Sequence, residues 1–235
     1  MTPPAFLALW NGVVPERRAE YEAWHSIEHT PERIGAPGFR SVHRYRAEEG
    51  ADYFTFYELD GLEALETAEY AALMQEPTAW SRRMRPALTG FRRLPCRTLH
   101  ARRFGQGGAA ATLRIGAEGE AVLPLLGPVL KQAIVAGRIL GVVLGAASAV
   151  GRAYPVFPNA PAPRAESLLF LDATEPSGLP PVVEICLRAL SGLTVEASQW
   201  RLLQSLRRDQ LANPSAARQA SREDLRVTWD GPGSC

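Results

Sequence analysis

The sequence has little of several features that mark particular classes of protein. Its 235 residues include three scattered cysteines (Cys96, Cys186 and Cys235) with no Cys-x-x-Cys spacing, which disfavours a disulfide framework or a thiolate metal site. The formal net charge is +1, so no overall field attracts nucleic acid or an acidic membrane. The most apolar stretch, residues 134–150, is interrupted by glycines and falls short of the about 20 residues that a membrane span needs. We therefore expect a cytoplasmic globular protein that contacts neither nucleic acid nor membrane.

Histidine is scarce and unevenly placed. His25, His29 and His43 lie within nineteen residues of one another, and the fourth histidine, His100, is the last in the chain. Histidine is the side chain whose ordinary pKa lies closest to neutral pH, so it is the usual proton carrier in catalysis. Any acid–base chemistry is therefore expected in the first half of the chain.

Hydrophobic periodicity and turn residues predict the element order βαββαβ twice. In the first half, Pro15 begins a helix that Pro31, Gly35 and Pro37-Gly38 end, and a second helical region is interrupted at Pro77. The strands are predicted over residues 6–10, 39–47, 53–59 and 90–103, and then over 110–116, 138–149, 167–173 and 193–206, with second-half helices over 121–136 and 179–190. A proline-rich loop is predicted over 154–165, and a polar, mobile tail with a short helix near 216–225 follows.

One βαββαβ sheet has a helix-covered face and a bare face, and the bare face must be buried against something. A second unit on the same chain supplies that partner. The predicted fold class is α+β, with tandem ferredoxin-like βαββαβ repeats whose two antiparallel sheets face each other as an α/β barrel. The predicted divisions are a first repeat over residues 1–104 carrying the site, a linker over 105–108, a diverged second repeat over 109–208 and a tail over 209–235.

Several ordered blocks in residues 5–100 resemble one family. Residues 24–39 read WHSIEHTPERIGAPGF and lead into Arg44-Tyr45, and YEL at 57–59 and PTAWSRRM at 77–84 follow. This arrangement is similar to the EthD-like branch of the dimeric α/β-barrel superfamily. The resemblance implies a barrel of two ferredoxin-like sheets with a pocket near His29, and cofactor-free isomerisation, dehydration or oxygenation of small organic or aromatic compounds. His25 stands where relatives more often carry an aromatic residue.

His29 is the candidate general acid/base. The resemblance places it at the family's histidine position, and its ordinary pKa suits proton transfer at neutral pH. Arg44 and Tyr57 are the candidate catalytic helpers, and Glu32 or Glu58 is the candidate orienting carboxylate. The alternative is that His29 only hydrogen-bonds the turn that begins at Pro37.

Aromatic and basic side chains on the next strands are the candidate ligand-binding residues. If the strand faces coincide, aromatic rings with polar tips line one pocket; otherwise they form a stacked aromatic core. Arg44 and Arg46 either anchor a carboxylate or lie in solvent or in ion pairs. The candidate ligand-binding set is Trp24, His25, His43, Tyr45, Tyr53 and Trp80.

The segment HSIEH fits the His-x-x-Glu-His pattern of inverted zinc proteases. Residues four apart lie on one helix face, so His25 and His29 could share a metal with Glu28 as base. Pro31 and Gly35 follow at once, however, and no suitably spaced third ligand is evident. We expect no bound zinc or other metal, and no cofactor.

Two functions remain open from the sequence. The first is a cofactor-independent enzyme of the isomerase, lyase or oxygenase type that acts on a small aromatic or carboxylated metabolite through His29. The second is a non-catalytic small-molecule-binding or accessory protein of a catabolic or biosynthetic pathway. In either case the partner is a small-molecule ligand, and a homodimer of the tandem unit is possible.

Overall fold

The computed structural model describes residues 3–50, 52–150 and 165–230, so the loop predicted over 154–165 lies almost wholly outside the described residues. None of the helices within these ranges combines the length and hydrophobicity that a membrane crossing requires. The first half contains the strands β1 (Ala5–Val13), β2 (Phe39–Ala47), β3 (Tyr53–Leu59) and β4 (Leu88–Arg103), and the helices α1 (Arg18–Trp24), α2 (Thr30–Gly35), α3 (Ala68–Gln75) and α4 (Ala79–Met84). The second half contains β5 (Ala109–Ile115), α5 (Gly119–Val135), β6 (Gly141–Ala147), β7 (Ser167–Ala173), α6 (Leu179–Ala189) and β8 (Val195–Arg207), and then α7 (Glu223–Arg226).

The eight strands form one closed antiparallel barrel in the order β1-β3-β2-β8-β5-β7-β6-β4. Within each half the order is that of a ferredoxin-like unit, with the first and third strands in the centre. The edge strands then pair between halves, β2 with β8 and β4 with β6, so that no edge is left open. The predicted fold class is confirmed. The boundaries between the repeats stay a prediction.

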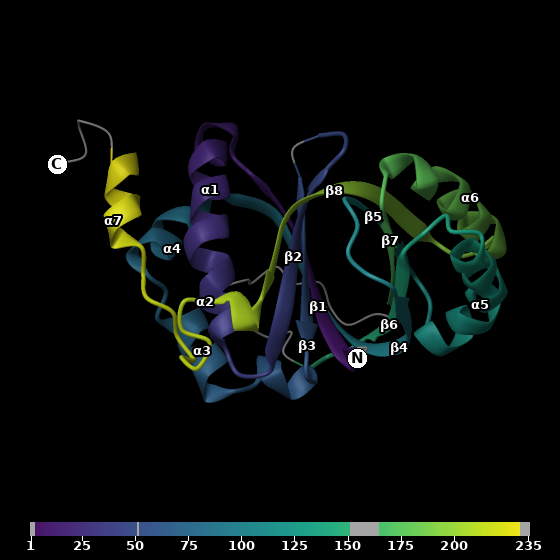
Figure 1. The fold of residues 1–235 in the computed structure, drawn as a ribbon, viewed down its shortest axis with the longest axis horizontal. Coiled ribbons are helices and arrows are strands. Elements are labelled where there is room, and N and C mark those ends of the chain that lie inside the picture. Colours follow the sequence, from purple (N-terminus) through teal and green to yellow (C-terminus); the bar gives the residue numbers. More distant parts are fainter. Residues whose placement is uncertain (1–2, 51, 151–164, 231–235) are drawn as a thin grey trace.

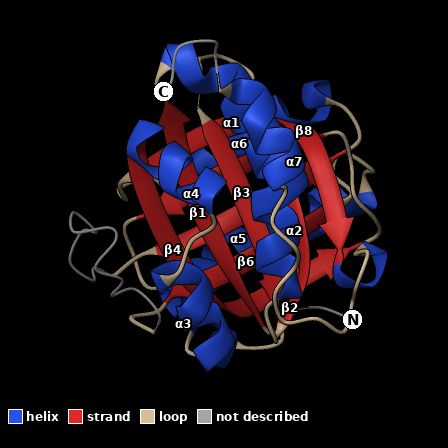
Figure 2. Ribbon diagram, turned by 90° about the vertical axis from the view of Figure 1, so that its left-hand side faces the viewer, coloured by secondary structure: helices blue, strands red, loops and turns tan. Residues whose placement is uncertain are grey.

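The barrel interior holds an aromatic core, and helices cover the outside. Phe56 contacts Phe6 at a ring-centroid distance of 4.8 Å and Phe170 at 4.7 Å, so strands from both halves meet in the core. The helices of the first half lie on one side of the barrel, whereas α5 and α6 lie on the opposite side (Figures 1 and 2). Each half therefore has a second core between its sheet and its helices.

A buried polar cluster lies at the end of the barrel where the chain passes from β4 to β5. Arg103 donates to Glu58 and, over 3.0 Å, to Asp172, which is fully buried. The Gly107 N–H donates to the other Asp172 oxygen over 2.7 Å, and Gln106 donates to the Tyr45 hydroxyl over 2.8 Å. One guanidinium thus joins β3, β4 and β7 across the two halves.

The interruption of the second helical region at Pro77 is found as predicted, as a gap between Gln75 and Ala79. Other elements differ from the sequence-based prediction. The strand predicted over 138–149 is shorter, because Gly137 has a φ of 67° and the chain enters β6 only at Gly141. The tail was predicted to be mobile, but residues 211–230 pack against the first half, and its helix covers only Glu223–Arg226.

Gly145 tests how tightly the barrel is packed. A Cβ at this position would lie 2.4 Å from two ring carbons of Phe6, so we expect Gly145→Ala to lower the free energy of unfolding by about 1–3 kcal/mol. Gly127, inside α5, has open space around it, and Gly127→Ala should raise the same quantity by about 0.5–1 kcal/mol. Urea denaturation measures both. A Gly145→Ala variant as stable as the wild type would show that the core is loosely packed.

Candidate functional site

The helix that carries His29 contains one π turn. His25–His29 forms a π-helix between α1 and α2, closed by the Thr30 N–H bonding to the His25 carbonyl. Pro31 follows in the first turn of α2, where its missing N–H leaves no donor unpaired. The helix thus continues for six residues beyond His29, rather than ending there as the sequence suggested. Single π turns of this kind are frequent at functional sites.

A pocket lies between this helix, α3 and the outer face of the first sheet. Its cavity volume is ≈ 50 Å³, so it is narrow. No aspartate or glutamate occurs among its lining residues in the described part of the chain. The lining residues are aromatic, aliphatic or basic, with few neutral polar groups: Leu9, Asn11, Tyr21, Trp24, His25, His29, Arg33, Phe39, Thr55, Tyr57, Tyr70, Met74, Arg85, Leu88, Phe91 and Arg93.

His29 lies in this pocket against an aromatic wall. Its ring packs on Trp24 at a centroid distance of 4.4 Å and meets the ring of His25 edge-on at 5.0 Å. Burial, and then the charges of Arg33, Arg85 and Arg44, lower the pKa of His29 well below its ordinary value of 6.5. The imidazole is therefore neutral at pH 7, which is the form that accepts a proton.

Several buried polar atoms of the pocket have no hydrogen-bond partner within the described residues, and three of them lie on side chains without a formal charge. They are His29 Nδ1, the Tyr57 hydroxyl and the Thr55 hydroxyl. Burial raises the pKa of Tyr57, so the phenol stays protonated and keeps a proton to donate. Because an unsatisfied buried polar group costs free energy, such groups are typically satisfied by a ligand or water.

Guanidinium groups gather at the α3 side of the pocket. Arg33 and Arg93 each lie 5.9 Å from the centroid of the Tyr70 ring, and Arg93 donates to the Tyr70 hydroxyl over 3.2 Å. Arg85 donates to the Met74 carbonyl over 3.0 Å, near the end of α3. These contacts hold Arg33 and Arg93 beside the Tyr70 ring and Arg85 near the end of α3.

Arg44, predicted to be a catalytic helper, does not line the pocket. It is 1% exposed, donates to the Ser26 hydroxyl over 2.5 Å and lies over the rings of Tyr21 and Tyr53. Arg44 therefore contacts the helix that carries His29 through Ser26, and its positive charge acts on that helix from outside the pocket. Arg46, the other predicted anchor, is partly exposed and lies 3.8 Å from Glu22.

The aromatic strand residues do not line one pocket. His43 and Tyr45 face the barrel interior, whereas Tyr57 faces the helices. A register shift between Phe39 and Ser41 breaks the simple alternation on β2, so Phe39 does not share the face of His43 and Tyr45. His43 lies 3.0 Å from the Ser205 hydroxyl and 3.8 Å from Glu58, and Tyr45 accepts from Gln106.

Tyr53 and Trp80, also predicted to bind a ligand, belong to a neighbouring core cluster with Tyr21 and Trp24. Tyr53 donates to Glu22 over 2.7 Å and Trp80 donates to Glu20 over 3.1 Å. Of the predicted site residues, the pocket thus brings together Trp24, His25, His29 and Tyr57.

The carboxylates near His29 are engaged elsewhere. Glu28 accepts from the Thr78 hydroxyl over 2.6 Å and from the Arg222 N–H over 2.7 Å, on the side of the tail. Glu58 lies inside the barrel, on the other side of the sheet from His29. Glu32 does not line the pocket: it lies 3.7 Å from Arg33 and 3.9 Å from Arg218, and neither of its oxygens has a hydrogen-bond partner within the described residues. Within the described residues there is no group of three or more histidines, cysteines or carboxylates that could hold a metal ion.

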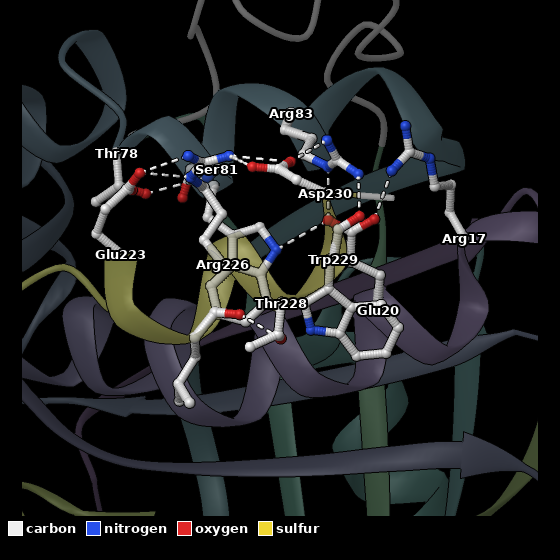
Figure 3. A network of polar contacts seen from close by, with 12 residues as sticks. Arg17, Glu20, Thr78, Ser81, Arg83, Glu223, Arg226, Thr228, Trp229 and Asp230 are labelled. Carbon is white, nitrogen blue, oxygen red and sulfur yellow. Dashed lines mark hydrogen bonds and ion pairs between the residues drawn. The ribbon is translucent and has the colours of Figure 1, made fainter. Parts of the chain in front are cut away.

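The tail braces the helix that carries His29. Arg83 of α4 donates to Glu20 of α1 over 2.7 Å, and also to Asp230 over 2.8 Å and to the Trp229 carbonyl over 2.9 Å (Figure 3). Trp229 packs against the same core cluster as Trp24. The π turn is thus held between the sheet and the tail, which fixes the position of His29.

Sequence reasoning missed the three pocket arginines. Arg33 could have been found, because it follows His29 by four residues and therefore lies on the same helix face. Arg85 and Arg93 reach the pocket from the end of α4 and from β4, and only the packing of the fold brings them to His29.

Comparisons with known proteins identify the fold. No family model matches the sequence, and no curated protein matches it. Solved structures do match: an anthrone oxidase-like protein is 11% identical with a TM-score of 0.65, covering 92% of this chain and 96% of that one. Candidate monooxygenases from Lactobacillus acidophilus (7% identity, TM-score 0.57, 87% and 96% covered) and Fusobacterium nucleatum (9%, 0.58, 88% and 96%) also match. The chain has the dimeric α/β-barrel fold. At these identities the likeness shows that fold alone, and it does not extend to the EthD-like branch.

Proposed function

We propose that this dimeric α/β-barrel protein is a cofactor-independent enzyme that acts on a small aromatic metabolite, with His29 as the proton acceptor. One observation carries the proposal: a neutral imidazole with an unpartnered nitrogen lies in an aromatic-walled pocket that Tyr57 also lines. A buried base without a partner costs stability, so its retention is explained by a ligand that uses it.

The pocket residues suit removal of a proton from an acidic C–H or O–H group. Neutral His29 accepts the proton, and Trp24, packed against its ring at a tilt of 35°, holds the imidazole in place. The Tyr57 hydroxyl can donate a hydrogen bond to the oxygen on which negative charge develops. Positioned donors and cations in a water-poor site stabilise such charge strongly.

The reaction type is supported by two likenesses. Residues 5–100 resemble the EthD-like branch, which includes cofactor-free isomerases, dehydratases and oxygenases. The structural neighbours include an anthrone oxidase-like protein and candidate monooxygenases. Proton removal to give a carbanion or phenolate is the common first step. In the oxygenase case dioxygen is the oxidant that then takes electrons from this anion.

A second function, ligand binding without catalysis, is favoured by the narrowness of the pocket. The cavity volume is only ≈ 50 Å³, so a ligand must displace side chains to enter. A binding or accessory protein needs only that the ligand be held, not that His29 meet a reacting atom.

A proton-exchange and oxygen-uptake assay separates the two functions. Chelator-treated protein is mixed with anthrone or with 1-hydroxy-2-naphthoate, and deuterium incorporation from D₂O and dioxygen consumption are followed. The proposal predicts protein-dependent exchange or uptake with at least one compound. Saturable binding of these compounds with neither exchange nor uptake above the protein-free rate would favour the binding protein.

A further inference from the structure

We infer that the pocket binds a planar aromatic acid, whose carboxylate pairs with Arg33 and is flanked by Arg85 and Arg93. This inference rests on the proposed ligand pocket and specifies the class of ligand. It assigns the acid group to residues on α2, α4–β4 and β4 rather than to Arg44, which the fold holds behind Tyr21.

Arg33 is a buried guanidinium that lacks a full set of partners. The residue is 4% exposed and lines the pocket, and its Nη1 has no hydrogen-bond partner among the described residues. The nearest carboxylate, Glu32, lies 3.7 Å from Nη1, beyond hydrogen-bond distance. Guanidinium groups bind carboxylates through two parallel N–H···O bonds, and a buried one without them is costly. A ligand carboxylate would supply the missing acceptors.

The local charge balance points to an anion. Arg33, Arg85 and Arg93 line the pocket together with two histidines and with no acidic residue among those described. Glu32 is the nearby compensating carboxylate, and it is shared with Arg218 at 3.9 Å. Burial raises the pKa of Glu32, and burial and then the like charge of Arg33 lower the pKa of Arg85. A bound anion relieves this repulsion.

The rest of the pocket favours a flat, unsaturated ligand body. The rings of Phe39 and Tyr70 are stacked at a centroid distance of 5.1 Å, and Trp24 packs against His29 at 4.4 Å. His29 and Arg33 are one helical turn apart, so their Cβ atoms are about 5–6 Å from each other. Both side chains line the same pocket, so one ligand can contact both.

Calorimetric titration with a charged and a neutral probe of the same shape tests the inference. 2-Naphthoate and 2-naphthamide are titrated at pH 7 into the wild type, Arg33→Gln, Arg33→Lys, His29→Asn and Arg188→Gln. Arg188 pairs with Glu184 on exposed α6 and serves as the matched control. The wild type should bind the acid at least tenfold more tightly than the amide.

The variants separate this inference from the proposed function. Arg33→Gln should bring the acid-to-amide ratio to within about threefold of one, Arg33→Lys should keep part of the preference, and Arg188→Gln should leave it unchanged. His29→Asn should retain the preference, because the anion site does not need a base. Equal binding of acid and amide by the wild type, binding of neither probe, or an unchanged ratio in folded Arg33→Gln would overturn the anion site. Loss of activity in His29→Asn with equal probe binding would overturn the anion site alone.

Discussion

Replacing His29 by asparagine should reduce turnover by about 10²–10⁴-fold, the usual contribution of a positioned general base. Asparagine keeps a polar side chain beside Trp24 but cannot accept a proton at neutral pH. The variant should still bind 2-naphthoate, because Arg33 is untouched. The measurement is the initial rate of the exchange or uptake reaction, with circular dichroism to confirm folding.

His100→Asn is the matched control, because His100 is exposed on β4 and outside the pocket. Its activity should equal that of the wild type. The pH dependence is a second readout: since the pKa of His29 lies well below 6.5, the base stays neutral and the rate stays high as the pH falls through 6.5. A His29→Asn variant with wild-type turnover, or a rate that halves near pH 6.5, would contradict the assigned role of His29.

Arg103→Met should lower the free energy of unfolding by about 3–5 kcal/mol at pH 7, because removal of one partner leaves buried charges uncompensated. Arg103 is the shared donor to Glu58 and Asp172 at the β4–β5 end of the barrel, and Asp172 is fully buried. Methionine keeps the unbranched stem of the side chain as far as the position of Nε, so the loss reports mainly the guanidinium and its charge. Urea denaturation measures it, and Arg188→Met, in an exposed pair, should change stability by less than about 1 kcal/mol.

The pKa of Glu58 determines how the stability loss of Arg103→Met changes with pH. Burial opposes its charged form, but His43, Arg103 and Ser41 outweigh burial and lower its pKa to about 2. A depressed pKa contributes stability above the ordinary value of 4.5, and this stability is lost as the pH falls towards 2. The deficit of Arg103→Met should therefore be largest at neutral pH and shrink below about pH 5. A deficit that is the same at pH 3 and pH 7 would show that the cluster contributes packing and not charge.

The fold could be predicted because local sequence patterns specify its elements and their order. Strand alternation and turn residues set the order βαββαβ in both halves, and the need to bury a bare sheet face predicts the second sheet. Closure through the β2–β8 and β4–β6 pairs depends on contacts far apart in the sequence, so its register could not be predicted. The packing of residues 211–230 on α1 and α4 likewise depends on partners such as Glu20 and Arg83, which no local pattern reveals.

The site could be predicted only in part. Tyr57 was predicted as a helper of His29, and both residues line the pocket, whereas Arg44, which the short turn after the helix was expected to bring close, does not. His43 and Tyr45 were assigned to the same pocket because the sequence did not decide which face of this strand lines it. The register shift between Phe39 and Ser41 shows why strict alternation fails on β2. A one-residue shift in a strand moves every following side chain to the other face.

The most direct test of a neutral base in a ligand pocket is the imidazole resonances of the four histidines across pH 5–8, with and without 2-naphthoate. His29 is assigned from the spectrum of His29→Asn. Its signals should remain those of a neutral ring at pH 6.5, and they should shift when the ligand is added. The signals of His43, inside the barrel, and of exposed His100 should not shift when the ligand is added. A His29 ring that titrates near 6.5 and is unaffected by the ligand would contradict the central claim.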